Sequence, residues 1–368
     1  MESTHFLVRR DRLSEHQTVT EPRRALAPDT AELRVDLFGF SANNVTYGAM
    51  GDALSYWKFF PESRPGWGRL PVWGFGTVVR STAERLTVGE RFFGYFPMSS
   101  HLVVEPRRID DAGFTDDAPH RRELDVVYNR YRRTTSDPIY RADTEPHQVV
   151  LRPLFITSFL LADYLQEHEF FGAEATLVSS ASSKLAWGMA FVLAAGRPAG
   201  HEVVGLTSVA NVAAVARLGL YDRVVAYGDL APLPQARRVV LIDIAGDPAG
   251  RAAIHRHHGD ALAHSLIVGA THWESRRPVE AVPGPAPLAF FAPTRIKQRS
   301  QQWTPAGLQS RLAAAWNALL APVLDPARGW LTIVRSAGAP AIERAYVAMI
   351  EGRARADHGH VFTLADGD

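Results

Sequence analysis

The sequence contains no cysteine among its 368 residues. This absence excludes disulfides, thiolate catalysis and every zinc site that needs sulfur ligands. Long apolar runs are also missing, because the longest candidate, residues 186–195, is too short to span a bilayer. The N-terminal residues lack the apolar core of a signal peptide. A formal net charge of +1 provides no global field for nucleic acid or anionic lipid. We therefore expect a cytoplasmic protein with a small-molecule substrate, and neither a nucleic acid nor a membrane as partner.

What is present is typical of a globular protein with two domains. Apolar residues make up 46% and charged residues 21% of the chain, and the length allows two cores of ordinary size. The first hundred residues predict short strands at 32–37, 73–79 and 91–96, with a turn at 89–90 and no helix of ordinary length. This part of the chain is predicted to be mainly β.

Between residues 110 and 147 the periodic pattern breaks. Charged and turn-forming residues dominate there, interrupted by the stretch 126–131. A segment of this length with little periodicity is usually a functional lid or a disordered loop. Both interpretations stay open, and His120, Arg121 and Tyr128 are the residues that a lid would carry.

After Leu151 short apolar strands alternate with helices. The predicted strands are 175–178, 202–206, 223–227, 239–243 and 265–268, and the predicted helices are 155–167, 184–195, 209–218 and 248–263. This alternation predicts a parallel sheet covered on both faces, which is a doubly wound nucleotide-binding domain. The tail predicts helices at 305–320 and 340–350, a strand at 330–334, and a C-cap at Gly352.

The most informative stretch is the turn between the strand 175–178 and the helix that begins at Lys184. Small side chains there allow backbone N–H groups to approach a diphosphate, which then lies at the positive end of the helix. The predicted cofactor contacts are Ser180, Ala181, Ser182, Ser183 and Lys184. The alternative interpretation is an ordinary N-cap followed by a solvated lysine.

The end of the next strand indicates which dinucleotide is preferred. NAD-specific sites usually place an acidic residue there, whereas this chain has Thr207, Ser208 and Asn211 and no acid before Asp222. Because a carboxylate would repel a 2′-phosphate, its absence favours NADP(H) over NAD(H). Arg217 lies too far along the helix to replace it, so Ser208 and Asn211 are expected to act as neutral donors.

Over nearly its full length the chain resembles the medium-chain dehydrogenase/reductases of the zinc-free quinone-oxidoreductase type. Residues 39–47 resemble the segment beside the nicotinamide, 74–79 the G-x-G-x-V strand, 88–92 the V-G-D-R-V turn, 153–158 the Pro followed by Thr-Ala, and 345–353 the closing A-x6-G-R motif. More narrowly, the chain resembles a bacterial branch of that superfamily, the DUF2855-like proteins. At the three glycine positions of the family's usual G-x-x-G-x-x-G pattern, this chain has Ser180, Ser183 and Ala186.

The resemblance implies an α/β fold with a mainly β, GroES-like catalytic domain (1–152 and 289–368, with 110–147 as an insertion) and a Rossmann domain (153–288). The resemblance implies further cofactor contacts at Thr157, Ala245, Gly246, Gly269 and Ala270. Without cysteine neither zinc of the zinc-dependent relatives can form, so no metal is expected. Relatives commonly dimerise through the edges of their nucleotide-binding sheets, which implies a homodimer.

The resemblance also places Asn44 and Tyr47 beside the nicotinamide, where they are the candidate catalytic donors. Asn43, Tyr56, Trp57 and Tyr128 are the candidate substrate-pocket residues. The alternative is that residues 43–44 form a turn and that the aromatic residues belong to the core. The activity so implied is hydride transfer between NADP(H) and an activated C=C or C=O bond, as in an enone, quinone or enoyl thioester.

Two other features have a simple structural interpretation beside a functional one. The basic run 290–299, with Lys297, fits a phosphate contact or, more simply, a basic surface turn. The run His255–His258 lies on a predicted helix whose adjacent positions do not share a face, which argues against metal binding. Two alternative functions stay open because a fold does not fix a function: a redox-silent NADP(H) sensor, and a lyase or isomerase.

Overall fold

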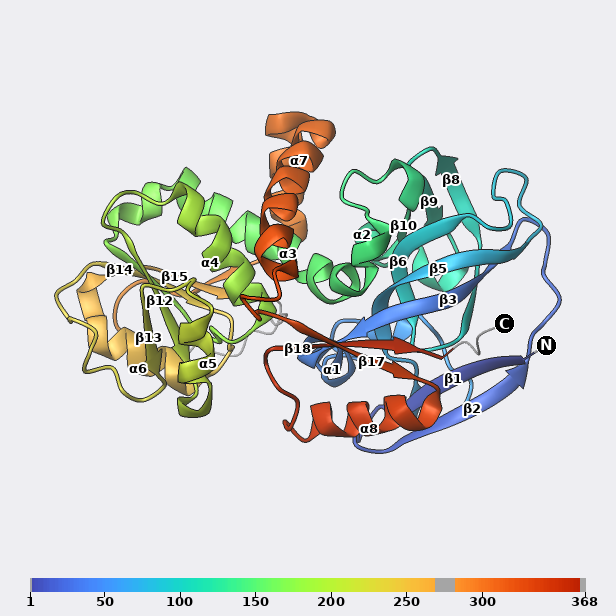
Figure 1. Ribbon diagram of the computed structural model, residues 1–368, viewed down its shortest axis with the longest axis horizontal. Helices are drawn as coiled ribbons and strands as arrows, with labels where there is room; N and C mark the ends of the chain where they lie inside the picture. Colours follow the sequence, from blue (N-terminus) through green and yellow to red (C-terminus); the bar gives the residue numbers. More distant parts are fainter. Residues whose placement is uncertain (1, 269–281, 365–368) are drawn as a thin grey trace. The chain divides into compact units, whose positions relative to one another are not determined.

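The structure, a computed structural model, describes residues 2–268 and 282–364. The chain divides into two compact units, Met1–Pro153 with Leu331–Asp368, and Leu154–Trp330. The boundary on the N-terminal side lies inside helix α3 (Glu145–Glu167). On the C-terminal side it differs from the expectation, since residues 289–330 belong to the second unit. Each unit is described by itself below (Figure 1).

The first unit is built on two β-sheets (Figure 1). The larger has the order β17-β18-β3-β5-β6-β10-β9-β8, with β7 paired to β3, and the smaller has the order β2-β1-β4. The strands predicted at 32–37, 73–79 and 91–96 are confirmed. The bounds are β1 (Glu2–Arg9), β2 (His16–Pro22), β3 (Ala31–Phe40), β4 (Trp67–Gly68), β5 (Pro71–Ser81), β6 (Arg91–Pro97), β7 (His101–Val104), β8 (Pro106–Asp110), β9 (Gly113–Asp116), β10 (Arg130–Arg133), β17 (Thr332–Ala337) and β18 (His358–Thr363).

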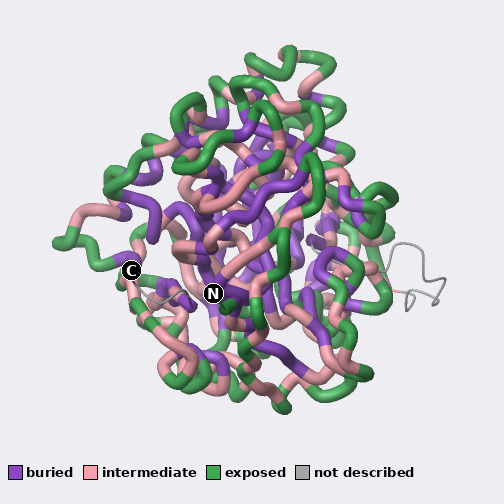
Figure 2. Tube along the Cα trace, turned by 90° about the vertical axis from the view of Figure 1, so that its right-hand side faces the viewer, coloured by how far each residue is buried: buried purple, intermediate pink, exposed green. Residues whose placement is uncertain are grey.

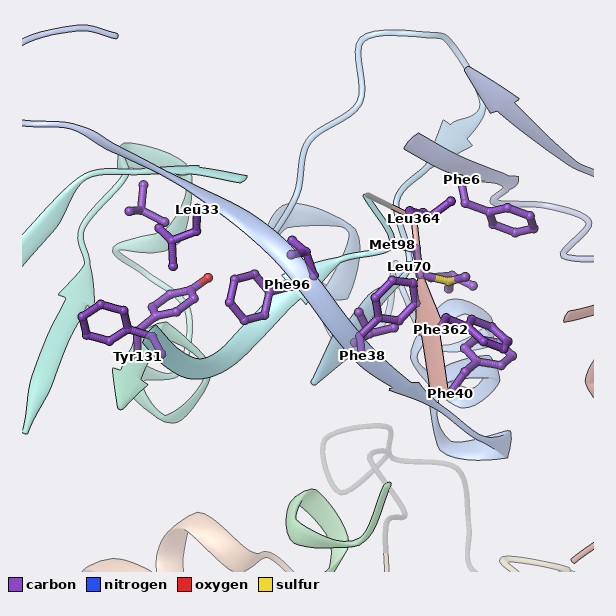
Figure 3. Packing of buried hydrophobic residues seen from close by; sticks show 14 of the residues in the cluster. Phe6, Leu33, Phe38, Phe40, Leu70, Phe96, Met98, Tyr131, Phe362 and Leu364 are labelled. Carbon is purple, nitrogen blue, oxygen red and sulfur yellow. The ribbon is translucent and has the colours of Figure 1, made fainter. Parts of the chain in front are cut away.

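The main core of this unit lies between its sheets and contains many aromatic rings (Figure 3). Phe40 of β3 stacks on Phe362 of β18 with ring centroids 5.5 Å apart, and Phe38 meets Phe362 edge to face. Each fully buried phenylalanine contributes roughly 1.5–3 kcal/mol to folding. The C-terminal strand β18 is thereby held in the sheet of the N-terminal segment, although more than 300 residues separate them in sequence.

The first unit contains the predicted helix 340–350, which is α8 (Ala339–Ile350), and also a helix within the first hundred residues, where the sequence predicted none of ordinary length. Helix α1 covers Ala42–Ala49, and its start is fixed by Ser41, whose backbone N–H donates to Asn44 Oδ1 at 2.9 Å. This local cap outweighs the tendency of two asparagines to form a turn. The other helical segments are α2 (Val126–Asn129), η1 (Tyr56–Lys58), η2 (Pro119–Arg121), η3 (Thr134–Ser136) and η4 (Ala142–Thr144).

The segment 110–147 contains regular secondary structure and is not a disordered loop, whereas its role as a lid stays a prediction. It contains β9, α2 and β10, and β10 pairs with both β9 and β6. Its pattern was hard to read because its strands are four residues long. The segment then enters α3, which begins ten residues earlier than predicted, at Glu145.

Helix α3 is long and apolar. By length and composition alone, the stretch 142–167 qualifies as a membrane-spanning helix, with a mean hydropathy of 1.3. This stretch was not noticed in the sequence because polar residues interrupt its apolar run. However, 67% of its apolar window is buried inside the protein, as expected of a core helix. Its first turns cross β3 at Gly39, where a Cβ atom would lie 2.3 Å from the carbonyl oxygen of Val149, so only glycine fits there.

The second unit contains the predicted doubly wound parallel sheet. Its order is β13-β12-β11-β14-β15-β16, and every pair is parallel. The bounds are β11 (Ala175–Val178), β12 (Glu202–Thr207), β13 (Arg223–Ala226), β14 (Val239–Asp243), β15 (Leu262–Val268) and β16 (Leu288–Phe290). This is the classic dinucleotide-binding strand order, in which ligands bind at the carboxyl ends of the central strands.

Consecutive strand residues face opposite layers of this sheet. Val178 and Ile242 pack with α3 and α4, whereas Leu177 and Leu241 pack on the side of α6. Both central strands are buried throughout, and Figure 2 shows exposed chain mainly in outer turns and helices. The helices are α4 (Lys184–Gly196), α5 (Val212–Arg217), α6 (Pro248–His258) and α7 (Ala292–Leu324), with η5 (Glu169–Gly172), η6 (Val209–Asn211) and η7 (Gly259–Ala261).

Ion pairs explain why residues 289–330 belong to this unit. Arg299 of α7 binds Asp163 of α3 through two nitrogens, at 2.7 and 2.9 Å, and Arg295 binds the same carboxylate at 2.6 Å. Both arginines are buried, so two residues of the basic run 290–299 hold α7 against α3. Lys297 of the same run is exposed.

Candidate functional site

The turn after β11 has the geometry that a phosphate site requires. Ser180 has a left-handed backbone (φ 52°), and the N–H of Ala181 donates to the carbonyl of Leu206 at 3.0 Å. Ser183 is the N-cap of α4, and its hydroxyl accepts from the N–H of Ala186 at 3.2 Å. The first N–H groups of a helix have no partner within the helix. The turn therefore presents the positive end of a 13-residue helix at the carboxyl edge of the sheet.

Small residues are necessary in this turn because it packs directly against β12. A Cβ atom added to Gly205 would lie 2.8 Å from the Cβ of Ala181 and 3.0 Å from the ring of Tyr221. The hydroxyl of Tyr221 donates to the carbonyl oxygen of Ala181 at 3.0 Å. Glycine in the strand thus replaces one of the glycines that related turns place in the loop.

The buried carboxylate beside the turn is neutralised. Asp243, the last residue of β14, accepts from the hydroxyl of Ser179 at 2.8 Å and pairs with Arg251 at 2.7 Å. The predicted cofactor residues Ala245 and Gly246 follow it, and their N–H groups donate to Ser179 Oγ (2.9 Å) and Asp243 Oδ1 (3.1 Å). An anion at the turn would therefore face a carboxylate whose charge is already balanced.

The predicted residues after β12 lie beside the turn. The amide of Asn211 donates to the hydroxyl of Ser182 at 3.4 Å, which joins the start of α5 to the loop. Thr207 is buried and Ser208 is exposed. The residues that follow β12 thus lie next to the turn that follows β11, as the sequence predicted.

The first acidic residue after β12 lies at the opposite edge of the sheet. Asp222 precedes β13, accepts from the N–H of Val203 near the start of β12 at 2.7 Å, and pairs with Arg197. It is therefore a structural residue at the amino ends of the strands. The end of β12 offers only neutral side chains.

Sequence reasoning missed Tyr227, which follows β13. Its hydroxyl accepts a hydrogen bond from the N–H of Ser180, and its own N–H donates to the carbonyl of Thr207 at 2.7 Å. A half-exposed tyrosine directly after a parallel strand was the available signal. Its hydroxyl therefore contacts the turn at Ser180.

Three predicted cofactor residues are less informative. Thr157 is half-buried on α3, next to Ser158, whose hydroxyl donates to the carbonyl of Leu185 at 2.8 Å. Its contact with a cofactor stays a prediction. Gly269 and Ala270 lie outside the described residues.

The predicted catalytic asparagine serves first to position α1. Besides capping that helix, Asn44 donates through Nδ2 to the carbonyl of Pro71 at 3.1 Å, and it is buried. Its carbonyl oxygen and one amide hydrogen are thus used within the protein. Its role as a donor to a substrate stays a prediction.

Three of the predicted residues, Tyr47, Tyr56 and Tyr128, meet in one place, together with Tyr95 of β6. We call these four the phenol cluster. The ring centroids are 4.5 Å apart for Tyr47 and Tyr56 and 4.8 Å for Tyr95 and Tyr128. The rings of Phe59, Phe60 and Trp73 surround them. The cluster combines an aromatic enclosure with several hydroxyl groups.

The phenols remain protonated over the whole physiological range. Burial raises the pKa of Tyr47, of Tyr95 and of Tyr128, and the neighbouring phenols raise it further. Hydrogen bonds from Trp73 and Asn43 act in the opposite direction on the pKa of Tyr47, since they stabilise its phenolate. The four hydroxyls are therefore donors. Smaller opposing effects act on the pKa of Tyr56, through the hydrogen bond with Tyr128, and on that of Tyr95, through the charge of Arg121.

Trp57 is not part of this cluster. Its indole packs against Gly51 and Gly68, where a Cβ atom would come within 2.1 and 2.6 Å of the ring, and it belongs to the main core of the first unit. Its assignment to the substrate pocket disagrees with this position. Trp57 follows Tyr56 directly in the sequence, but the two side chains lie in different clusters because the chain turns within η1.

Arg121 fixes the segment that carries Tyr128. Its side chain, 1% exposed, pairs with Asp116 at 2.6 Å and donates to Asn129 Oδ1 at 2.9 Å and to the carbonyl of Tyr128 at 2.7 Å. It also donates to the hydroxyl of Tyr131 at 3.0 Å. The sequence left a lid and a solvated loop open for Arg121; its burial excludes the solvated loop and makes it an internal anchor, and a lid stays a prediction.

Two of the three histidines in the run on α6 are engaged in local hydrogen bonds. His255 bonds to Ser265 at 2.9 Å and to the carbonyl of Pro283 at 2.8 Å, and His257 bonds to the carbonyl of Leu233 at 2.7 Å. Among residues 2–268 and 282–364, no group of His, Asp or Glu is arranged to hold a metal ion.

A comparison with protein families gives one match, to the family described as "Protein of unknown function (DUF2855)", over residues 38–355. The match covers most of both units. The chain belongs to this family. The DUF2855 resemblance stated from the sequence is thereby confirmed. No curated protein matches the chain.

Solved structures of similar fold extend over the whole chain. CurA from Vibrio vulnificus in complex with NADPH superposes with a TM-score of 0.59 at 9% identity, covering 99% of this chain and 100% of the other. The yhdH oxidoreductase from Salmonella enterica in complex with NADP gives 0.55 at 12%, and the quinone oxidoreductase from Coxiella burnetii 0.53 at 11%, each covering 99% and 100%. The expected α/β fold, with a GroES-like and a Rossmann unit, is confirmed.

Proposed function

We propose that this protein is a zinc-independent, NADP(H)-dependent oxidoreductase of the medium-chain reductase type. The observation that carries the proposal is the turn 179–183, in which small residues and the cap of α4 leave a helix N-terminus open at the carboxyl edge of a Rossmann sheet. Proteins of the same fold that bind NADPH or NADP support it, although their sequences differ widely from this one.

The residues of the turn fit a diphosphate. Helix N–H groups after Ser183 and the hydroxyl of Ser182 are donors to phosphate oxygens, and the carboxylate of Asp243 is balanced by Arg251. Tyr227 accepts from Ser180 at this place, so its hydroxyl competes with a phosphate oxygen for that N–H group. The neutral residues Ser208 and Asn211 favour a ribose 2′-phosphate over the bare hydroxyl that an acid would bind.

Bound NADPH would supply a hydride, so that substrate, NADPH and one proton yield reduced substrate and NADP⁺. The acceptor is an activated C=C or C=O bond, whose oxygen gains negative charge during reduction. Hydrogen-bond donors in a dry site stabilise that charge. Tyr47 is the proposed proton donor, because it lies in the segment that resembles the one beside the nicotinamide in zinc-free quinone oxidoreductases, and burial, which raises its pKa, keeps it protonated. Asn44 holds α1, which carries Tyr47, at the correct position.

The test is to mix the purified protein with NADPH and a panel of enones, quinones and enoyl thioesters. We expect NADPH absorbance to fall with at least one class and deuterium from C4 of labelled NADPH to appear in the product. Tyr47→Phe is expected to lower kcat by about 10²-fold. If NADPH binds and no member of the panel is reduced, the reductase assignment is contradicted and a sensor is favoured.

We further propose that the protein is a homodimer joined along β16. This strand is the edge of the parallel sheet, and Leu288 on it and Phe291 beside it are each about half exposed. Light scattering on the intact chain should give twice the mass of 40.5 kDa. Leu288→Lys should reduce that mass to one chain, whereas a monomeric wild type contradicts this proposal.

A further inference from the structure

Tyr95 has a buried hydroxyl that nothing in the fold uses. The residue is 0% exposed, and its oxygen has no hydrogen-bond partner among the described residues. A buried hydroxyl without a partner costs roughly 1–3 kcal/mol relative to one that is bonded. Phenylalanine would fill the same space without this cost. The hydroxyl therefore indicates a partner that the protein alone does not supply.

The hydroxyls of Tyr56 and Tyr128 point to the same conclusion. Their oxygens are 3.4 Å apart, which is long for an O–H···O hydrogen bond, whose usual length is about 2.7–2.8 Å. An acceptor oxygen placed to one side of the pair, at about 2.7–2.8 Å from both oxygens, would receive a hydrogen bond of normal length from each. The ring of Tyr128 also contacts that of Tyr95, with centroids 4.8 Å apart, and meets the ring of Tyr56 edge to face at 6.0 Å, so the three phenols belong to one cluster.

We infer that Tyr56, Tyr95 and Tyr128 together bind the oxygen atom of the substrate, and that this oxygen belongs to a neutral, planar carbonyl compound. This inference rests on the proposed reductase function and assigns the oxygen-binding role to residues other than Asn44 and Tyr47. Asn44 uses most of its amide within the fold. Tyr47 then keeps its proton for transfer.

The charges around the cluster select against an anionic group. Burial raises the pKa of Tyr95 and the charge of Arg121 opposes this more weakly, but four of the five N–H donors of Arg121 are occupied by Asp116, Asn129, Tyr131 and the carbonyl of Tyr128, so it cannot form a bidentate pair with a carboxylate. The carboxylate of Asp125 acts on both Tyr56 and Tyr128, whose pKa it raises. A carboxylate entering the cluster would lose its hydration and meet a negative charge, whereas a ketone or aldehyde would not.

The aromatic enclosure selects for a flat molecule. Phe59 and Trp73 lie with ring centroids 5.3 and 5.0 Å from that of Tyr95, and both also approach Tyr128. These rings pack against one another, and their outer faces and edges would pack in the same way against a conjugated ligand, at centroid separations of about 4.5–7 Å. Arg121 is a positioning residue here, because it holds the backbone of Tyr128 and stacks on Phe59.

The experiment uses a dye, para-dimethylaminocinnamaldehyde, whose absorption band moves to longer wavelength when its carbonyl oxygen accepts hydrogen bonds. The dye is titrated into the full-length protein without NADPH. We expect saturable binding with a red shift. Tyr95→Phe and Tyr128→Phe, which remove only a hydroxyl, should each weaken binding about tenfold and reduce the shift. The matched control is Tyr346→Phe, a buried tyrosine of the main core that bonds to Leu13, and it should bind the dye as wild type does.

The corresponding acid, para-dimethylaminocinnamic acid, is ionised at neutral pH and should bind at least tenfold more weakly than the aldehyde. Equal binding of acid and aldehyde, a bound dye without a red shift, or unchanged binding in both phenylalanine variants would each overturn the inference. Thermal unfolding of every variant checks the fold. NADPH binding is measured separately: if it fails while the dye results hold, the reductase assignment is contradicted and the oxygen site is supported.

Discussion

The two units build their candidate sites in opposite ways. In the second unit the phosphate turn is five consecutive residues, 179–183, followed by a helix. In the first unit the phenol cluster takes one residue each from α1, η1, β6 and α2, which span more than 80 positions of the sequence. The turn leads into the first N–H groups of a helix, whereas the cluster buries side-chain donors among rings.

This difference teaches which kind of site depends on local structure and which on the whole unit. The turn needs only a strand, a cap and room beside Gly205. The cluster needs the register of β5 and β6, which places Trp73 opposite Tyr95, and the anchor at Arg121, which places Tyr128. We therefore expect substitutions far from the phenol cluster to disturb its geometry, whereas only substitutions adjacent to the turn 179–183 should disturb the turn.

The largest effect is expected from Arg121→Met. It leaves the carboxylate of Asp116 buried without its partner, which should lower the free energy of unfolding by about 3–5 kcal/mol. Urea denaturation measures this, with Arg122→Met as control because its ion pair with Asp117 is exposed. Equal stability of the two variants would show that Arg121 does not anchor the segment.

Gly205→Ala tests the room beside the turn. The new methyl group would lie 2.8 Å from the Cβ of Ala181, so we expect a loss of about 1–3 kcal/mol in the free energy of unfolding and weaker NADPH binding. Ala181→Gly in the same chain should restore part of both, since it removes the other methyl group. A single variant as stable as wild type would contradict the close approach.

Acid is expected to affect both units through buried histidines. Burial lowers the pKa of His5 in the first unit and of His258 in the second, each from 6.5 to about 4. Between pH 4 and pH 6.5 the unfolded chain binds more protons than the folded protein does. The contribution of these histidines to the free energy of unfolding is therefore fully present above pH 6.5 and decreases as the pH falls towards 4. Each histidine should contribute roughly 1–3 kcal/mol to this decrease. Urea denaturation across this range measures it, and His258→Gln should flatten the slope.

The smallest effect concerns the choice of nucleotide. Ser208→Asp places a carboxylate at the end of β12, where it should repel a 2′-phosphate and bind a ribose hydroxyl. We expect the ratio of NADPH to NADH affinity to fall about tenfold, with Ser208→Asn as the uncharged control. Fluorescence titration with both nucleotides gives the ratio. An unchanged ratio would mean that the 2′-position lies elsewhere.

The same contrast explains what the sequence predicted. The strands and helices from 175 to 268 were predicted closely because each is a local apolar pattern, and the turn because its residues are consecutive. Helix α1 was missed because its start depends on one side-chain cap at Asn44. The elements of 110–147 were missed because they are short and are stabilised by partners far away, such as β6 for β10. Tyr95 was missed because only the fold brings it to Tyr128.

The most direct test of the account is calorimetric titration of NADPH into two variants of the N-cap of α4. Asparagine and aspartate both cap helices well, so Ser183→Asn and Ser183→Asp should preserve α4, but only aspartate adds a negative charge beside the proposed diphosphate. We predict NADPH affinity near that of wild type for Ser183→Asn and at least tenfold weaker for Ser183→Asp. Equal affinities of the two variants, or no NADPH binding by the wild type, would contradict the placement of the cofactor at this turn.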